Sequence, residues 1–137
     1  MKDIMVAYDG DAPGHRALAI AAELAQALRA RGGAASIVLC SVVPESPLEP
    51  TPLWDNDSVH ARLLAEASIE LAGHGIAARA VMVRGDPAVE ISRAAVEHGC
   101  DTIVVGTHAT AKGIDPERSV AAQLALHADA AVVVVAR

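Results

Sequence analysis

Three short, uninterrupted apolar runs constrain the fold of this 137-residue chain more than any other feature of its sequence. They are IVLC at 37–40, TIVV at 102–105 and AVVVV at 131–135. A strand with one buried face alternates apolar and polar residues, whereas an unbroken apolar run indicates burial on both faces. The runs therefore predict a parallel sheet with helices packed on each side.

Strand and helix patterns alternate along the whole chain. The clearest helical spacing lies in 13–30, which carries a stripe of Ala17, Leu18, Ala21, Leu24, Ala25 and Leu28. Strands are predicted at 3–8, 35–42, 76–83, 102–105 and 131–135, and helices at 13–30, 58–73, 87–98 and 116–127. The prediction is an α/β fold, a doubly wound five-stranded parallel sheet of order 3-2-1-4-5 with four helices, in one domain over 1–137.

A ligand is expected at the carboxyl ends of the first and fourth strands. In doubly wound sheets ligands bind beyond these ends, where the winding direction reverses. With the predicted order, that crevice lies between YDG at 8–10 and GTH at 106–108. Segment 103–120 also has the layout of a phosphate site, because an apolar strand ends in Gly106 and a helix begins near 118–120.

Charge and aromatic content disfavour several classes of partner. The formal net charge is −6, and Tyr8 and Trp54 are the only aromatic residues. Nucleic-acid binding needs a basic face and often uses aromatic stacking, so nucleic acid is not an expected partner. No stretch approaches 18 consecutive apolar residues, and the first ten residues lack an apolar leader. We therefore expect no membrane segment and a cytoplasmic location.

Cysteines and histidines give no sign of a metal centre or of covalent catalysis. Cys40 and Cys100 are far apart in the sequence, outside a CxxC arrangement, and are expected to be small reduced thiols. The six histidines lack the one-face spacing of a zinc helix motif, so no metal site is predicted. No serine or cysteine stands in a nucleophile elbow.

One connection, 43–57, is longer than usual and contains four prolines. Such a segment is either a lid over a site or a variable surface insertion. Its Trp54 has three readings: it pins the segment to the sheet, stacks on a bound base, or contacts a partner subunit.

Four motifs together resemble the universal stress protein family. They are VAYDG at 6–10, SVVP at 41–44, VRGDPAVEI at 83–91, and IVVGTH at 103–108 leading to RSV at 118–120. The resemblance spans essentially the whole chain and implies an adenine nucleotide alpha hydrolase-like fold. It also implies that Asp9 and Val42 hold the ribose and adenine of a nucleotide. Gly106, Ser119 and Val120 match the family's phosphate-binding motif.

The chain departs from that motif in its phosphate-binding part. Ala109 and Arg118 stand where the second and third glycines are expected, one residue too close together. A Cβ costs roughly 1 kcal/mol where glycine's conformations are needed, and Arg118 either obstructs a phosphate or captures it. Asp115 is the predicted N-cap of the fourth helix, where its carboxylate would compete with phosphate. His108 and Lys112 are candidate phosphate contacts or ordinary loop residues.

The fifth strand is expected to be an edge strand and an interface. Val132, Val133, Val134 and Val135 make it strongly apolar, and an uncovered apolar edge favours pairing with another chain. The resemblance likewise implies a homodimer through this strand. The alternative is an edge covered by the fourth helix.

Two functions follow from these observations. The first is a cytoplasmic stress-response protein that acts as a dimeric binding or regulatory module with a degenerate nucleotide site, and not as an enzyme. The second is an ATP-binding family member with slow ATP hydrolysis or autophosphorylation through Asp9, His108 and Ser119, which makes ATP with Mg²⁺ a candidate cofactor. A phospho-accepting receiver domain is disfavoured, because the third strand ends at Val83-Arg84-Gly85 without an aspartate.

Overall fold

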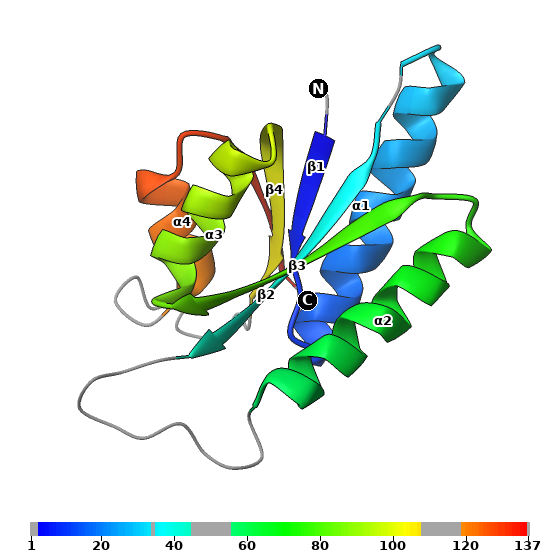
Figure 1. The fold of residues 1–137 in the computed structure, drawn as a ribbon. Coiled ribbons are helices and arrows are strands. Elements are labelled where there is room, and N and C mark those ends of the chain that lie inside the picture. The colour runs from blue at the N-terminus through cyan, green and yellow to red at the C-terminus, as the bar shows by residue number, and fades with distance from the viewer. Residues whose placement is uncertain (1–2, 34, 45–55, 108–118, 137) are drawn as a thin grey trace.

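The computed structural model describes residues 3–33, 35–44, 56–107 and 119–136, in which a five-stranded sheet lies between two layers of helices (Figure 1). The strands are β1 (Asp3–Ala7), β2 (Ile37–Pro44), β3 (Ala78–Gly85), β4 (Cys100–Gly106) and β5 (Ala131–Val135). All are parallel, in the order β3-β2-β1-β4-β5. The predicted doubly wound sheet and its strand order are confirmed.

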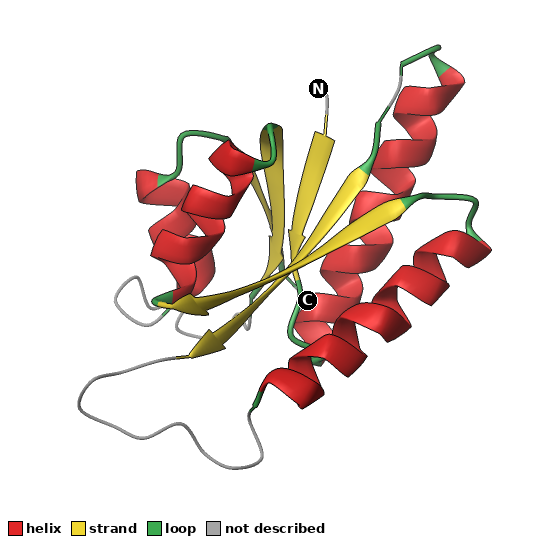
Figure 2. Ribbon diagram, viewed as in Figure 1, coloured by secondary structure: helices red, strands yellow, loops and turns green. Residues whose placement is uncertain are grey.

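Two helices cover each face of the sheet (Figure 2). The helices α1 (Ala12–Ala30) and α2 (Asp57–Gly73) pack on one face, and α3 (Pro87–Glu97) and α4 (Val120–His127) on the other. Successive side chains of the central strand enter different cores: Ile4 and Val6 face α1 and α2, whereas Met5 faces α3 and α4. This alternation is the reason why the inner strands are apolar without interruption.

Side-chain caps start the helices at the carboxyl edge of the sheet. Asp11 accepts a hydrogen bond from the backbone N–H of Gly14 at 2.7 Å, and Asp86 accepts one from Val89 at 3.2 Å. Each cap satisfies an N–H group that has no partner inside its helix. The helix starts therefore gather at the edge where a ligand was expected.

Of the two starts predicted for the fourth helix, the one near 118–120 is confirmed and the one at 116 with Asp115 as its cap is wrong, because α4 begins at Val120. Ser119 is the N-cap, because its backbone is extended (φ −85°, ψ 119°) and its hydroxyl accepts the N–H of Ala122 at 3.2 Å. Asp115 lies outside the described residues.

Strands β2 and β3 each lie two residues later than the apolar pattern suggested. β2 pairs with β1 from Ile37 opposite Ile4, and its pairing with β3 continues to Pro44 opposite Gly85. The extension includes Arg84, whose side chain forms an ion pair with Asp57 at the start of α2. The ends of both strands are set by their pairing with neighbouring strands, which the sequence of one segment does not specify.

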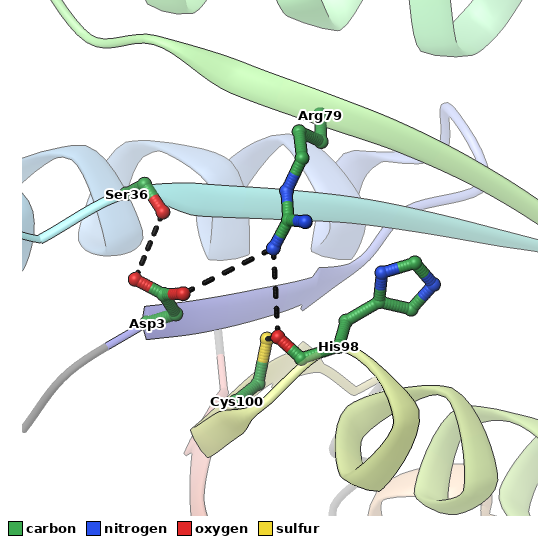
Figure 3. Close-up of polar contacts among 5 residues, drawn as sticks. All are labelled: Asp3, Ser36, Arg79, His98 and Cys100. Carbon is green, nitrogen blue, oxygen red and sulfur yellow. Dashed lines mark hydrogen bonds and ion pairs between the residues drawn. The ribbon is translucent and has the colours of Figure 1, made fainter.

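The amino edge of the sheet is held by polar contacts (Figure 3). Ser36 donates a hydrogen bond to Asp3 at 2.8 Å, and an Nη atom of Arg79 lies 3.9 Å from the other carboxylate oxygen of Asp3. The same guanidinium reaches the carbonyl oxygen of His98 at 3.5 Å. These contacts join β1, β3 and the residue before β2 to the turn before β4, at the end of the sheet opposite to the helix starts.

Candidate functional site

A pocket of about 360 Å³ opens at the carboxyl edge of β1, β2 and β4. Its wall is largely apolar, with Val42, Leu63, Ile91, Val105 and Val120 among the lining residues, and Tyr8, Asp9 and His60 add polar groups. This size lies in the lower part of the range of small-molecule sites, which are typically apolar clefts with a few placed polar groups. The pocket includes the predicted crevice and extends beyond it over the end of β2.

The structure brings several of the predicted site residues to this pocket. Asp9, Val42 and Val120 line it directly. Gly106 ends β4 immediately after Val105, and Ser119 precedes Val120 at the cap of α4. The predicted phosphate contacts at 108 and 118, His108 and Arg118, lie outside the described residues, as do Ala109, Lys112 and Trp54.

Asp9 is the acidic group of the pocket wall. Desolvation, followed by the neighbouring Asp11, raises the pKa of its carboxyl from 3.8 to about 6. Asp9 is nevertheless exposed to solvent, and water reduces the energetic consequence of this shift. One oxygen of Asp9 accepts the backbone N–H of Asp11 at 3.3 Å, which fixes the turn before α1. The group is therefore placed to accept a hydrogen bond from a ligand when ionised.

Ser119 has a structural partner as well as its predicted role. Its hydroxyl oxygen accepts the Ala122 N–H at the start of α4, and it lies 3.5 Å from the hydroxyl of Thr107 after β4. An N-cap hydroxyl that accepts a backbone N–H still carries its own proton. Ser119 can thus cap α4 and donate to a ligand at the same time.

Gly106 is required by packing, independently of any phosphate. A Cβ at this position would lie 2.1 Å from the carbonyl oxygen of Pro13 and 2.7 Å from its Cβ. The first turn of α1 therefore rests directly on the backbone of β4. The sequence motif suggested close approach of a ligand here, and the structure adds a close approach of a helix.

The pair Ser41 and His60 is a feature of the site that the sequence analysis missed. The Ser41 hydroxyl lies 2.5 Å from Nδ1 of His60, and their exposed fractions are 0% and 5%. The signal was present in the spacing, because His60 continues the buried stripe of α2 formed by Leu64, Ala67 and Leu71. Val59, the residue before it, lines the pocket and is half-buried.

The thiols are poor nucleophiles. Cys40 lines the pocket, and burial raises its pKa to about 12. Burial likewise raises the pKa of Cys100 to about 11. Both are free cysteines, as expected, and both remain protonated at neutral pH. Among the residues that the structure describes, no group of three His, Cys, Asp or Glu side chains is arranged to hold a metal ion.

Residues 1–136 match the sequence model of the Universal stress protein family. The chain belongs to this family. The match covers nearly the whole chain and confirms the resemblance seen in its four motifs. None of the helices in the described ranges combines the length and hydrophobicity that crossing a bilayer requires. Among curated proteins, none has a significantly similar sequence.

Solved structures of the same family share the fold. A universal stress protein family member from Burkholderia pseudomallei is 28% identical, with a TM-score of 0.72 over 98% of this chain and 95% of that one. The universal stress protein from Archaeoglobus fulgidus in complex with dAMP is 21% identical, with a TM-score of 0.73 over 98% and 97%. A family protein from Arabidopsis thaliana with AMP bound is 21% identical, with a TM-score of 0.71 over 100% and 92%.

Proposed function

We propose that this universal stress protein binds an adenine nucleoside or nucleotide in the carboxyl-edge pocket and acts as a cytoplasmic stress-response module rather than as an enzyme. The observation that carries the proposal is the pocket itself, which collects Asp9, Val42 and Val120 from three separate segments of the chain. Two structures with the same fold carry AMP and dAMP, which supports an adenine ligand.

The phosphate-binding part of the site is proposed to be weak. Ala109 and Arg118 replace the expected glycines in the sequence. None of the described lining residues is a lysine or arginine, and Asp9 adds a negative charge when ionised. An uncharged base and ribose suit this wall better than a triphosphate does. We therefore propose that ATP, with or without Mg²⁺, binds with little more affinity than AMP.

Calorimetric titration tests this proposal with adenosine, AMP and ATP plus Mg²⁺. The expected result is saturable binding of adenosine and AMP, with ATP no tighter than AMP and no phosphate released on incubation. Arg118→Gly is expected to increase the affinity for ATP relative to that for AMP. ATP binding more than about tenfold tighter than AMP in the unaltered protein would refute the degenerate site.

A pair of valine variants tests the location. Val42→Phe enlarges a half-buried side chain that lines the pocket, whereas Val96→Phe makes the same change on the exposed face of α3. AMP binding should be lost in the first variant and kept in the second. Equal affinity in both would place the ligand elsewhere.

We further propose a homodimer through β5. This strand lies at the edge of the sheet, and Val134 is 37% exposed, whereas Val133 packs against the core below α1. Val134→Glu should therefore give monomers without disturbing the core. Met82→Glu is a matched control, because Met82 is 39% exposed on β3, the opposite edge strand. Light scattering that finds Val134→Glu still dimeric would move the interface away from β5.

A further inference from the structure

We infer that Arg16 and Glu23 of α1 form two symmetric ion pairs across the homodimer, each Arg16 with Glu23 of the partner subunit. This inference rests on the homodimer proposed through β5 and adds to it a second, charged contact on one face of the sheet. The occupant of this surface is therefore a second copy of the same chain. The inference depends on where α1 places these two side chains relative to β5.

The two residues lie on the flank of α1 that faces away from α2. Gln26 and Arg29 of α1 donate hydrogen bonds at 3.4 and 2.5 Å to carbonyl oxygens of the turn after α2, so they mark the flank toward that helix. At 3.6 residues per turn, Arg16, Ile20 and Glu23 point about 120° away from them. These three residues form what we call the α1 stripe. Because α1 contacts β5 beyond β4, the stripe lies on the side of the β5 edge.

The α1 stripe is level with the middle of β5. A Cβ on Gly106 would touch Pro13, so the start of α1 lies beside Gly106, whose register partner on β5 is Val135. The middle of the stripe is six to seven residues further along α1, which is roughly 10 Å at 1.5 Å per residue. Since α1 runs back against the strand direction, about the same distance covers three residues back along β5. This point is Val132, next to the central residue of the strand, Val133.

A two-fold axis through the centre of β5 therefore pairs the stripe with itself. When β5 pairs antiparallel with β5 of a second copy in one continuous sheet, the axis is perpendicular to the sheet, and both α1 helices lie antiparallel on the same face. The axis then passes level with Ile20. Arg16, four residues before it, faces Glu23 of the partner subunit, and the same contact occurs twice. The stripe has the self-complementary charge that an isologous interface needs.

The spacing of the two helices selects long side chains for this contact. Because α1 lies over β4 and β5, its axis is about one strand inside the edge. With strands about 4.8 Å apart, the two α1 axes would be about 14 Å apart. Helices in direct contact are about 8–10 Å apart, so small side chains cannot meet across this gap. Arginine and glutamate can, and they combine charge attraction with directional hydrogen bonds.

Arg16 has no acceptor in the part of its own chain that the structure describes. Its side chain is half-buried, and its Nε is buried without a hydrogen-bond partner. Glu23 is exposed, and neither residue forms an ion pair within the described ranges. A guanidinium that lies against the protein without an acceptor is destabilising. A carboxylate of the partner can pair with the part of the side chain that stays exposed.

A charge-swap experiment tests the pairing. The dimer dissociation constant is measured by analytical ultracentrifugation for the unaltered chain, Arg16→Glu, Glu23→Arg and the double variant. Each single variant places two like-charged pairs at the interface and should weaken the dimer by at least about tenfold. The double variant restores opposite charges with the positions exchanged, so its dissociation constant should return to within about threefold of the original. The differences should shrink as salt is added.

A matched control separates pairing from net charge. Arg62 is exposed on α2, which covers the other half of the sheet, and Arg62→Glu makes the same charge change as Arg16→Glu. Its dimer should dissociate like that of the unaltered protein. Glu23→Arg alters an exposed position, so it tests the pairing even where replacement of the half-buried Arg16 lowers the melting temperature.

The outcomes distinguish the homodimer from the ion pairs. If the unaltered chain is monomeric, or if Val134→Glu leaves it dimeric, the proposed β5 interface and this inference both fall. If Val134→Glu gives monomers but Arg16→Glu and Glu23→Arg leave the dissociation constant unchanged, the inference alone is wrong. Single variants that weaken the dimer without recovery in the double variant would also overturn the pairing.

Discussion

Replacement of Gly106 by alanine is the sharpest test of how the sheet and the first helix are joined. The added Cβ would lie 2.1 Å from the carbonyl oxygen and 2.4 Å from the carbonyl carbon of Pro13. Ordinary carbon contacts need about 3.5 Å, so β4 and the start of α1 would have to separate by about 1 Å. The neighbour is backbone at the start of a capped helix and cannot turn aside like a flexible side chain.

The expected cost is large for one methyl group. Overpacking costs about 1 to 3 kcal/mol, and a clash with rigid backbone belongs at the upper end, near 3 kcal/mol. Unfolding entropy of about 2.1 cal/mol/K per residue gives about 0.29 kcal/mol/K for a chain of this length, so the melting temperature should fall by about 10 °C. Gly106→Ala and the unaltered chain are compared by calorimetry without ligand.

Gly73→Ala serves as the matched control. Gly73 is the last residue of α2, and apart from its chain neighbours and the helix's own backbone nothing lies within 4 Å of an added Cβ. The change should leave stability unchanged or raise it by up to about 1 kcal/mol, because alanine favours the helix. A Gly106→Ala protein that melts within about 2 °C of the original would refute the packing argument. Loss of nucleotide binding at unchanged stability would show that the glycine serves the ligand alone.

Two further predictions concern titrating groups. The Asp9 carboxyl has a pKa of about 6 in the folded chain and near 3.8 when unfolded, so the folded state binds more protons between these values and stability falls as the pH rises through this window. Asp9→Asn should remove this fall and, allowing for solvent screening, raise the free energy of unfolding at pH 7 by about 1 kcal/mol. Urea titrations of both proteins at pH 4.5 and pH 7 measure the effect. The same fall in stability in both proteins would contradict the prediction. Cys40 and Cys100, with pKa values of about 12 and 11, should react slowly with a thiolate-selective reagent at pH 8 in the folded chain. Both should react fully in denaturant. Rapid modification of the folded chain would contradict their burial.

Local patterns predicted the architecture of this chain because helix and strand signals agree with the global fold. The unbroken run at 102–105 and the stripe from Ala17 to Leu28 reflect burial that the structure confirms. The alternation of strands and helices along the chain then permits only a few sheet topologies. The ends of the strands were harder to predict from sequence, because β2 and β3 continue as far as their residues pair with each other. The start of α4 was misjudged because Asp115-Pro116 and Ser119 are both good caps in sequence, and only the backbone angles decide between them.

The site was predictable only in part. Asp9, Val42 and Val120, which the motifs assign to one site, all line the same pocket, and their role in binding stays a prediction. The contact between Ser41 and His60 joins two elements that are 19 residues apart, and its geometry depends on how α2 lies over β2. The packing role of Gly106 depends in the same way on the path of α1, which no local pattern specifies.

Binding of an adenine nucleoside or nucleotide in the carboxyl-edge pocket can be followed residue by residue in amide NMR spectra of the ¹⁵N-labelled chain, recorded during titration with AMP. We expect saturable shifts centred on Tyr8, Asp9, Val42, His60 and Val120, with the amino edge around Asp3 and Arg79 unchanged. No shifts at millimolar AMP, or saturable shifts confined to another surface, would contradict it.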